Sequence, residues 1–340
     1  MRVLVVNAGS SSLKLRVLGA TDQLELSQDL RTVHGRPDPA ALRRALDAAG
    51  AVDAVGHRIV HGGTQFRAPV LVDQSVTARL RALTDLAPLH QPKSLAALEA
   101  VSAALPGVPA VACFDTAFHA GLPPEATTYA LPPEWRRRWN LRRYGFHGLS
   151  HAWAARRAAE LTGRSASGFR VVTAHLGAGA SLAAVRDGCS VDTTMGFTPL
   201  EGLVMATRSG SVDPGLVLWL QEHVGTPPEE LAATLEHRSG LLGLAGTADM
   251  RDVLIAAGER ADDGADSSGP TTTVPPADAR LALGVYVHRL RGAVAAMAAA
   301  LGGLDALVFT GGVGENAPEV RRLVADGLAF LGIAVDPGRN

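Results

Sequence analysis

The feature that most constrains the fold of this chain is a pattern of residues that occurs twice. Residues 3–17 combine an apolar run, a turn of small and hydroxyl-bearing residues around Gly9, and a second run in which apolar and polar residues alternate. Residues 170–185 repeat this order around a second glycine turn. Each copy predicts two strands joined by a tight polar turn. Because the copies lie about half the chain length apart, the sequence predicts two duplicated domains.

The two turns are candidate sites for an anion. In the first turn, backbone N–H groups, three serine hydroxyls and the nearby ammonium group of Lys14 are all groups that bind phosphate. In a duplicated protein, two such turns can face one another across a central cleft. On the first stretch alone, an ordinary surface turn rich in glycine and serine is the alternative.

Composition limits the classes of protein to consider. A chain of 340 residues is too long for a single core, so two domains are expected. The formal net charge of −1 provides no electrostatic footprint for nucleic acid or an anionic membrane. No apolar run approaches the roughly 20 residues of a membrane span. Cys113 and Cys189 lie among small or apolar residues, as expected for reduced thiols. We therefore expect a cytoplasmic protein with no nucleic-acid or membrane partner.

The remaining sequence predicts an α/β protein. Residues 21–37 are polar and predict an irregular segment, and residues 260–276 predict a surface insertion of low complexity. Strands are predicted at 51–60, 108–114, 305–310 and 332–335, and helices at 38–49, 73–86, 93–104, 150–161, 277–301 and 318–331, with Ser150 as an N-cap.

Glycine turns that follow strands point to a nucleotide. A P-loop is excluded, because the segment from Gly9 to Lys14 lacks the second glycine and continues as a strand. Residues 312–317 do match the dinucleotide pattern G-x-G-x-x-A, with Asp336 about 20 residues further on. An NAD-dependent oxidoreductase is therefore a rival hypothesis. Against it, that fold normally begins with this motif, whereas here the motif comes near the end of the chain.

A group of cationic and acidic side chains favours phosphoryl transfer. Arg58, His90, His147 and Arg208 lie in loops or at strand ends, and Asp115 follows a predicted buried strand. Taken one by one, each histidine is better explained as a structural or surface imidazole, and each arginine as a member of a surface ion pair. Together with the glycine turns, they supply the positioning and charge neutralisation that phosphoryl transfer requires.

Eight segments, in order along the chain, resemble the acetate kinase family. They are residues 6–14, 56–63, 86–90, 114–119, 143–148, 195–202, 207–214 and 309–316. The resemblance implies an actin-like, ribonuclease H-like fold. It consists of two duplicated α/β domains, 1–114 and a nucleotide-binding 115–340, each with a mixed five-stranded sheet, around a central cleft.

The resemblance also implies the reaction. A family member phosphorylates acetate reversibly to acetyl phosphate by direct in-line transfer from ATP, with Mg²⁺ or Mn²⁺, and acts as a homodimer. Since one methylene in an apolar pocket is worth only about 1–3 kcal/mol, a kinase for propionate or another short-chain acid is an alternative. A carboxylate substrate is already ionised and nucleophilic, so the acidic residue is expected to orient an arginine or the metal.

Roles are implied residue by residue. The catalytic set implied by the resemblance is Asp115, His147, Arg208 and Arg58, with Asn7 as a metal ligand. The implied substrate pocket comprises Arg58, Val60, Leu89, His90, Phe146 and Pro199. The implied nucleotide site comprises Lys14, His175, Leu176, Gly177, Ala178, Gly179, Asp249, Met250, Arg251, Gly312, Val313, Gly314, Glu315 and Asn316.

Three departures from the family pattern matter. The second turn reads Gly-Ala-Gly-Ala at 177–180, where the family usually has Gly-Asn-Gly-Ser, so an amide and a hydroxyl are missing. The first domain is short between residues 17 and 52. The sequence stops at Asn340, before the family's closing segment with a Thr-Asn-Glu-Glu motif that contributes a metal ligand. A nucleotide-binding pseudokinase is therefore a further alternative, as is a piece of a longer protein.

Overall fold

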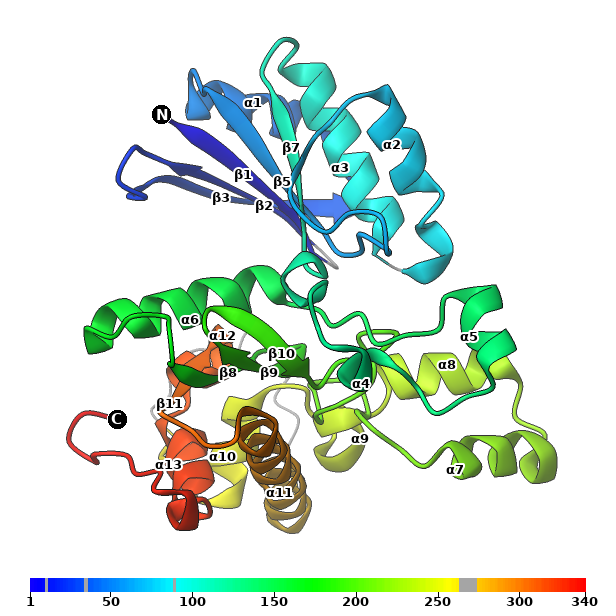
Figure 1. Ribbon diagram of the computed structural model, residues 1–340, viewed down its shortest axis with the longest axis vertical. Coiled ribbons are helices and arrows are strands. Elements are labelled where there is room, and N and C mark those ends of the chain that lie inside the picture. The colour runs from blue at the N-terminus through cyan, green and yellow to red at the C-terminus, as the bar shows by residue number, and fades with distance from the viewer. Residues whose placement is uncertain (10–11, 34–35, 88–89, 263–273) are drawn as a thin grey trace. The chain divides into compact units, whose positions relative to one another are not determined.

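The computed structural model describes residues 1–9, 12–33, 36–87, 90–262 and 274–340. The chain forms two compact units, Met1–Ala120 and Gly121–Asn340 (Figure 1). The sequence places a domain boundary after residue 114, and the division of functions between the two domains stays a prediction. Leu89 and most of the insertion predicted at 260–276 lie outside the described residues.

The first unit is built on a mixed sheet in the order β4-β3-β2-β1-β5-β7-β6. Its strands are β1 (Val3–Ala8), β2 (Ser12–Leu18), β3 (Leu24–Val33), β4 (Arg36–Pro37), β5 (Ala54–Ile59), β6 (Val70–Leu71) and β7 (Ala110–Phe114). Its helices are α1 (Pro39–Ala49), α2 (Gln74–Arg81) and α3 (Gln91–Ala104), with 3-10 turns η1 (Thr84–Leu86) and η2 (Ala117–His119).

Alternation along β1 and β2 separates a core face from a polar face. Leu4, Val6, Leu13 and Leu15 are buried against apolar residues of α1 and α3. Asn7 lies directly opposite Lys14 in the antiparallel pairing of the two strands, so both side chains point to the other face. The predicted hairpin is therefore confirmed, and its register places Asn7 and Lys14 opposite one another near the ends of the two strands.

The second unit has a sheet in the order β10-β9-β8-β11. Its strands are β8 (Arg170–Leu176), β9 (Ala180–Arg186), β10 (Cys189–Thr193) and β11 (Ala306–Thr310). Its helices are α4 (Pro124–Thr127), α5 (Pro133–Trp139), α6 (Gly148–Thr162), α7 (Pro214–Trp219), α8 (Pro228–His237), α9 (Gly240–Ala245), α10 (Met250–Ala257), α11 (Pro276–Leu301), α12 (Gly311–Asn316) and α13 (Pro318–Asp326). The π-helical turn η3 (Leu220–Val224) and the 3-10 turn η4 (Ala329–Leu331) complete the unit. Helix α6 covers one face of the sheet and α11 the other (Figure 1).

The two sheets share one topology. In each, three strands that follow one another along the chain pair antiparallel, and a later strand pairs parallel with the first of the three. The later strand is β5 beside β1 in the order β3-β2-β1-β5, and β11 beside β8 in the order β10-β9-β8-β11. The predicted duplication is thus confirmed.

The strand counts differ from the expected five per sheet. Among the described residues one sheet has seven strands and the other four. The prediction of an irregular segment at 21–37 is wrong, because these residues include β3, whose Leu26 and Leu30 pack on the core. The prediction of a strand at 332–335 is also wrong, because Gly332 adopts φ +76° and ends the preceding 3-10 turn.

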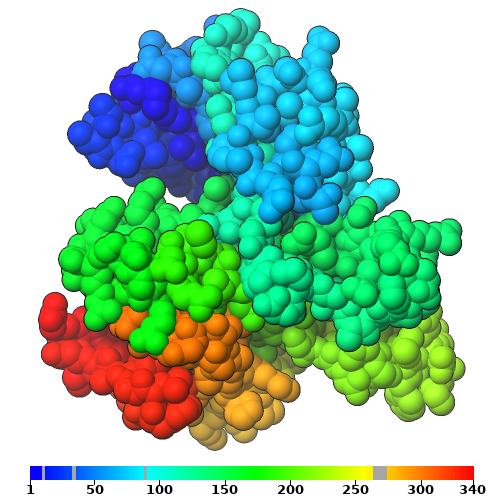
Figure 2. Space-filling view, viewed as in Figure 1, coloured from blue at the N-terminus to red at the C-terminus, as the bar shows by residue number. Residues whose placement is uncertain are grey.

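The cysteines and some large apolar side chains lie at or near the surface. Cys113 and Cys189 are free thiols, the first half-buried and the second exposed. Large apolar side chains are exposed on α7 and η3, including Leu218 and Trp219, and this yellow-green segment lies at the surface of the second unit (Figure 2). None of the helices in the described ranges is long and apolar enough to cross a membrane.

Candidate active site

Three polar side chains meet at one edge of the first sheet. Arg58 lies near the end of β5, Asn7 near the end of the neighbouring β1, and Asp115 directly after β7. These strands are parallel, so their carboxyl ends lie at the same edge, which is where α/β proteins bind ligands.

Arg58 is held from two directions. Its Nε donates to both Asp115 oxygens at 3.1 and 3.0 Å, and its Nη2 donates to Oδ2 at 2.5 Å. Its Nη1 donates to Asn7 Oδ1 at 3.0 Å. The negative charge of Asp115, which is only 2% exposed, raises the pKa of Arg58. The structure thus pairs Arg58 with Asp115, and their catalytic roles stay predictions.

The other predicted residues of this unit lie at different depths. Val60 is buried, His90 is half-buried at the start of α3, and Lys14 is exposed on β2 across from Asn7.

A second cluster lies in the second unit, where α6 packs on the sheet. His147 adopts φ +58° as the N-cap of α6, one turn earlier than the predicted cap at Ser150, so that prediction is wrong. The left-handed backbone turns the imidazole back toward β9, where Nδ1 lies 2.9 Å from Ser181 Oγ. The Ser150 hydroxyl instead lies 2.9 Å from His175 Nδ1.

Arg208 lies beside His147 at the glycine turn. A Cβ at Gly179 would be 3.3 Å from His147 Nε2 and 3.5 Å from Arg208 Nη1, so glycine allows both side chains to approach the turn. Arg208 donates to the Pro199 carbonyl at 3.3 Å and forms no ion pair within the described ranges. Burial lowers the pKa of Arg208, an effect that Glu236 partly offsets. A partly desolvated guanidinium of this kind is suited to an anionic ligand.

The loop that carries Pro199 is fixed by a polar network. Glu201 accepts hydrogen bonds from Tyr129 Oη and from Arg143 Nη2, each at 2.6 Å. Tyr129 Oη in turn accepts from the Phe197 N–H at 2.9 Å. Burial and the neighbouring Glu201 raise the pKa of Tyr129, so the phenol stays protonated and donates. Phe146, predicted for the substrate pocket, is fully buried.

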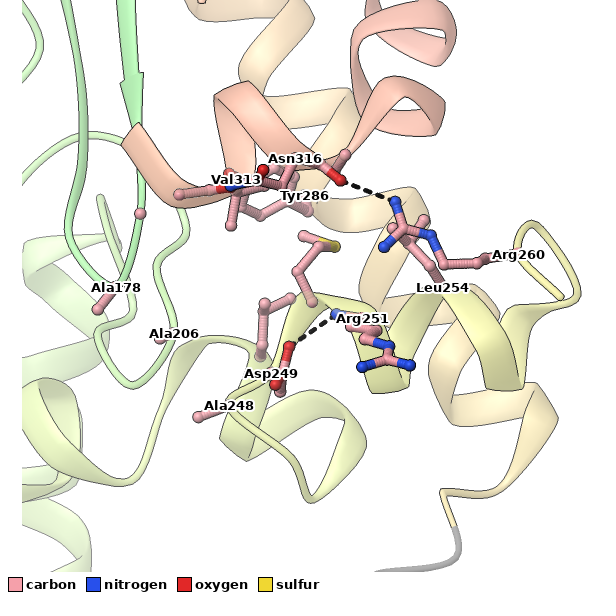
Figure 3. Close-up of a pocket in the computed structure, with 15 residues that line it drawn as sticks. Ala178, Ala206, Ala248, Asp249, Arg251, Leu254, Arg260, Tyr286, Val313 and Asn316 are labelled. Atoms are coloured by element: carbon pink, nitrogen blue, oxygen red, sulfur yellow. Dashed lines mark hydrogen bonds between the residues drawn. The ribbon is translucent and has the colours of Figure 1, made fainter. Parts of the chain in front are cut away.

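A cavity of about 510 Å³ lies beside the glycine turn of the second unit (Figure 3). Its lining combines the turn after β8, the start of α10 and helix α12. Eight of the residues predicted for the nucleotide line it: Gly177, Ala178, Asp249, Met250, Arg251, Gly312, Val313 and Asn316. Asp249 caps α10 by accepting from the Arg251 N–H at 2.8 Å. The cavity has the size and mixed lining of a small-molecule site.

Close backbone contact joins two of these segments. Gly311 adopts φ +80°, and a Cβ there would lie 2.6 Å from the Leu176 carbonyl oxygen. Glycine therefore permits α12 to begin against the end of β8. The segment 311–316, expected to be a turn, is a short helix.

Other predicted nucleotide residues do not line the cavity. His175, Leu176, Gly179, Gly314 and Glu315 are absent from its lining. Leu176 is fully buried. Glu315 accepts from Thr310 Oγ1 and the Gly311 N–H at 3.2 Å each, which supports the start of α12.

Sequence reasoning missed part of the lining. Leu241, Leu254 and Tyr286 form apolar walls, and Arg260 lies at the edge, where it donates to the Asn316 carbonyl at 2.9 Å (Figure 3). Arg260 also pairs with Glu319 at 2.6 Å. Nothing in the sequence marked these residues, because they belong to helices or their ends and carry no motif.

A metal ion would find few ligands from the chain itself. No group of three or more His, Cys, Asp and Glu side chains that could hold a metal occurs in the parts of the chain described. Mg²⁺, however, often takes one or two protein oxygens and completes its shell with water and substrate phosphates. Asn7 Oδ1 accepts one hydrogen bond and keeps a second lone pair, so it fits such a shared site.

The fold matches solved structures of acyl kinases. The structure of Porphyromonas gingivalis acetate kinase matches with a TM-score of 0.86 and 36% identity, over 98% of this chain and 89% of that chain. A propionate kinase from Francisella tularensis matches with a TM-score of 0.88 and 34% identity, over 98% and 90%. The fold is therefore that of the actin-like acetate and propionate kinases.

Sequence comparison defines the family. The model of the acetokinase family matches residues 40–340. Acetate kinase of Pseudothermotoga lettingae is 41% identical over 373 residues, covering 100% of this chain and 88% of the relative. Acetate kinase of Leifsonia xyli is 45% identical over 368 residues, covering 99% and 89%. The chain belongs to the acetokinase family.

Proposed function

We propose that this protein is an acetate kinase, which transfers the γ-phosphoryl group of ATP reversibly to acetate. The observation that carries the proposal is the pair formed by Arg208 and His147 at the glycine turn. Arg208 is partly buried and has no carboxylate partner in the described ranges, so an anion is the ligand that suits it. The adjoining cavity is suited to the nucleotide.

Acetate is proposed to bind at Arg58. A guanidinium has five N–H groups, and the contacts to Asp115 and Asn7 use Nε–H and one N–H on each terminal nitrogen. One N–H on Nη1 and one on Nη2 remain, and these are available to donate to a carboxylate. Asp115 would thus orient Arg58 and would not act as a base.

The proposed reaction needs no proton transfer. An oxygen lone pair of the ionised carboxylate attacks the γ-phosphorus, and the bond to the bridging oxygen breaks with its electron pair going to ADP. Arg208 and His147 offset the charge on the phosphoryl oxygens. Mg²⁺ or Mn²⁺, bound with ATP and held by Asn7, would supply further charge neutralisation there.

A hydroxamate assay with ATP, Mg²⁺ and acetate, propionate or butyrate tests this proposal. We expect acetyl hydroxamate as the main product and a propionyl product formed roughly 10–200-fold less efficiently, the effect of one methylene. Preference for propionate would favour the propionate kinase alternative, which the Francisella neighbour supports. No acyl hydroxamate with ATP binding intact would indicate a pseudokinase.

One earlier alternative and two further properties remain. An NAD-dependent oxidoreductase is disfavoured by the antiparallel strands β8, β9 and β10, which a dinucleotide fold does not contain. NADH binding without ATP binding would revive it. We further propose, on the basis of the family resemblance, that the protein is a homodimer, which light scattering of the purified protein would test. A cytoplasmic location is proposed from the two free thiols, and cell fractionation would test it.

A further inference from the structure

A chain of hydroxyl and imidazole groups lies behind His147. Thr173 on β8 and Ser181 on β9 point to the face of the sheet that α6 covers, and His151 of α6 lies between them (Figure 1). His151 Nδ1 is 2.7 Å from Thr173 Oγ1, and His151 Nε2 is 2.8 Å from Ser181 Oγ. All three residues are completely buried. Ser181 Oγ also lies 2.9 Å from His147 Nδ1.

The direction of these bonds follows from where the hydroxyl hydrogen of Thr173 goes. The single hydroxyl hydrogen of Thr173 has the Ala183 carbonyl oxygen as an acceptor, at 3.4 Å. Thr173 Oγ1 then accepts from His151 Nδ1–H. In the neutral ring of His151, Nε2 then carries a lone pair and accepts the hydrogen of Ser181 at 2.8 Å. With its hydrogen used, Ser181 Oγ accepts from Nδ1–H of His147.

We infer that Thr173, His151 and Ser181 form a hydrogen-bond relay that holds His147 in the Nδ1–H tautomer. The three are positioning residues, since they act through His147. His175 does not compete for Ser181, because its own Nδ1 lies against the Ser150 hydroxyl. The inference rests on the proposed function for its catalytic meaning, but the tautomer itself is a property of the free protein.

The relay decides what His147 presents to the glycine turn. The ring edge that faces Gly179 consists of Cε1 and Nε2. In the Nδ1–H tautomer this nitrogen carries a lone pair while the ring is neutral, and any second proton must bind there. His147 would then donate to a phosphoryl oxygen only as an imidazolium, which gives a charge-assisted hydrogen bond beside Arg208.

Long-range proton–nitrogen NMR of protein labelled with ¹⁵N-histidine tests the relay directly. A His147→Gln variant identifies the His147 signals. We expect Nδ1–H for the neutral His147 ring in the wild type, and a mixture of tautomers in Ser181→Ala. An Nε2–H tautomer in the wild type, or an unchanged Ser181→Ala spectrum, would overturn the inference. Neither result depends on acetate kinase activity.

Two buried threonines provide a matched comparison. Thr173 and Thr193 both lie opposite Ala183, on the two strands that flank it, but the Thr193 hydroxyl donates to the Leu182 carbonyl at 2.7 Å. Thr173→Val and Thr193→Val therefore each remove one buried hydroxyl with little change of shape. We expect Thr173→Val to change the His147 tautomer and Thr193→Val to leave it unchanged. Equal effects on the tautomer would contradict the relay.

Steady-state kinetics supply the functional readout. Ser181→Ala and Thr173→Val are expected to lower kcat about tenfold, comparable to the loss of one hydrogen bond, with both KM values within about twofold. Thr173→Ser keeps the hydroxyl and should restore both kcat and the tautomer. A Thr173→Ser protein as impaired as Thr173→Val would overturn the assigned role of the hydroxyl.

Discussion

Arg58 shows how one side chain combines a structural and a functional task. Its Nε and Nη2 are committed to Asp115, which is 3% exposed at the side chain, whereas the Arg58 side chain is 28% exposed. The pair is therefore buried on the carboxylate side and open on the guanidinium side. Removing either partner leaves the other without its counter-charge. If Arg58 is removed, the charge left unpaired is the carboxylate of Asp115, which is buried away from water.

Arg58→Ala is expected to lower the free energy of unfolding by about 3–5 kcal/mol, because Asp115 stays buried and unpaired. Asp115→Ala should cost a similar amount, and the double variant much less than the sum of the two. Urea denaturation of the four proteins measures this coupling. Additive effects would show that the ion pair contributes nothing.

Arg208 offers a test that separates catalysis from stability. We expect Arg208→Ala to lower kcat about 10²–10³-fold, the usual effect of losing one donor to transition-state charge. The KM for ATP should change by less than about threefold, since the cavity lining does not include this residue. Arg208→Lys should recover only part of kcat, because an ammonium lacks the planar fork. Full kcat in Arg208→Ala would refute the assigned role.

At the scale of elements, the sequence predicts strands and helices best where buried residues recur at a regular spacing. The two glycine-tipped hairpins and the long helix at 277–301 are confirmed as β1–β2, β8–β9 and α11. Strand β3 was missed because most of its residues are polar. Among its described side chains, Leu26 and Leu30 pack on the core. Its pairing with β2, a tertiary contact, holds it in place.

The candidate site likewise contains residues that the sequence predicts and residues that it does not. Motif residues such as Asp249 and Gly312 do line the cavity, because each glycine or cap is needed locally by the backbone that forms the wall. Tyr286 and Arg260 reach the same cavity from α11 and from the end of α10, and only the packing of these helices brings them there. The relay behind His147 likewise depends on how α6 packs on the sheet.

The turn after β8 gives a prediction of improved function. Ala178 lines the cavity and its carbonyl accepts from the Ala206 N–H at 3.1 Å, so the backbone is fixed and the side chain adds no polar contact. Ala178→Asn should lower the KM for ATP several-fold, about the effect of one hydrogen bond to a charged ligand. Ala206→Asn, on the same wall, is the control for added bulk. An equal or weaker ATP affinity in Ala178→Asn would contradict the prediction.

At the scale of the whole molecule, stability should depend on buried histidines in the first unit. His57 and His61 are almost completely buried, and burial lowers the pKa of each to about 4. In the unfolded chain a histidine has a pKa of about 6.5. Between these values the unfolded state binds protons that the folded state does not, so stability falls as the pH is lowered from about 6.5 to 4.

We expect the free energy of unfolding to decrease across this pH range by up to about 3 kcal/mol for each histidine. Urea denaturation at pH 7.5, 6.5, 5.5 and 4.5 measures the decrease. His57→Gln cannot be protonated and should flatten the pH dependence, whatever its effect at pH 7.5. His223→Gln, in the exposed η3 segment, is the matched control and should keep the wild-type slope. If His57→Gln loses stability with the same slope as the wild type, His57 is not a source of the acid sensitivity.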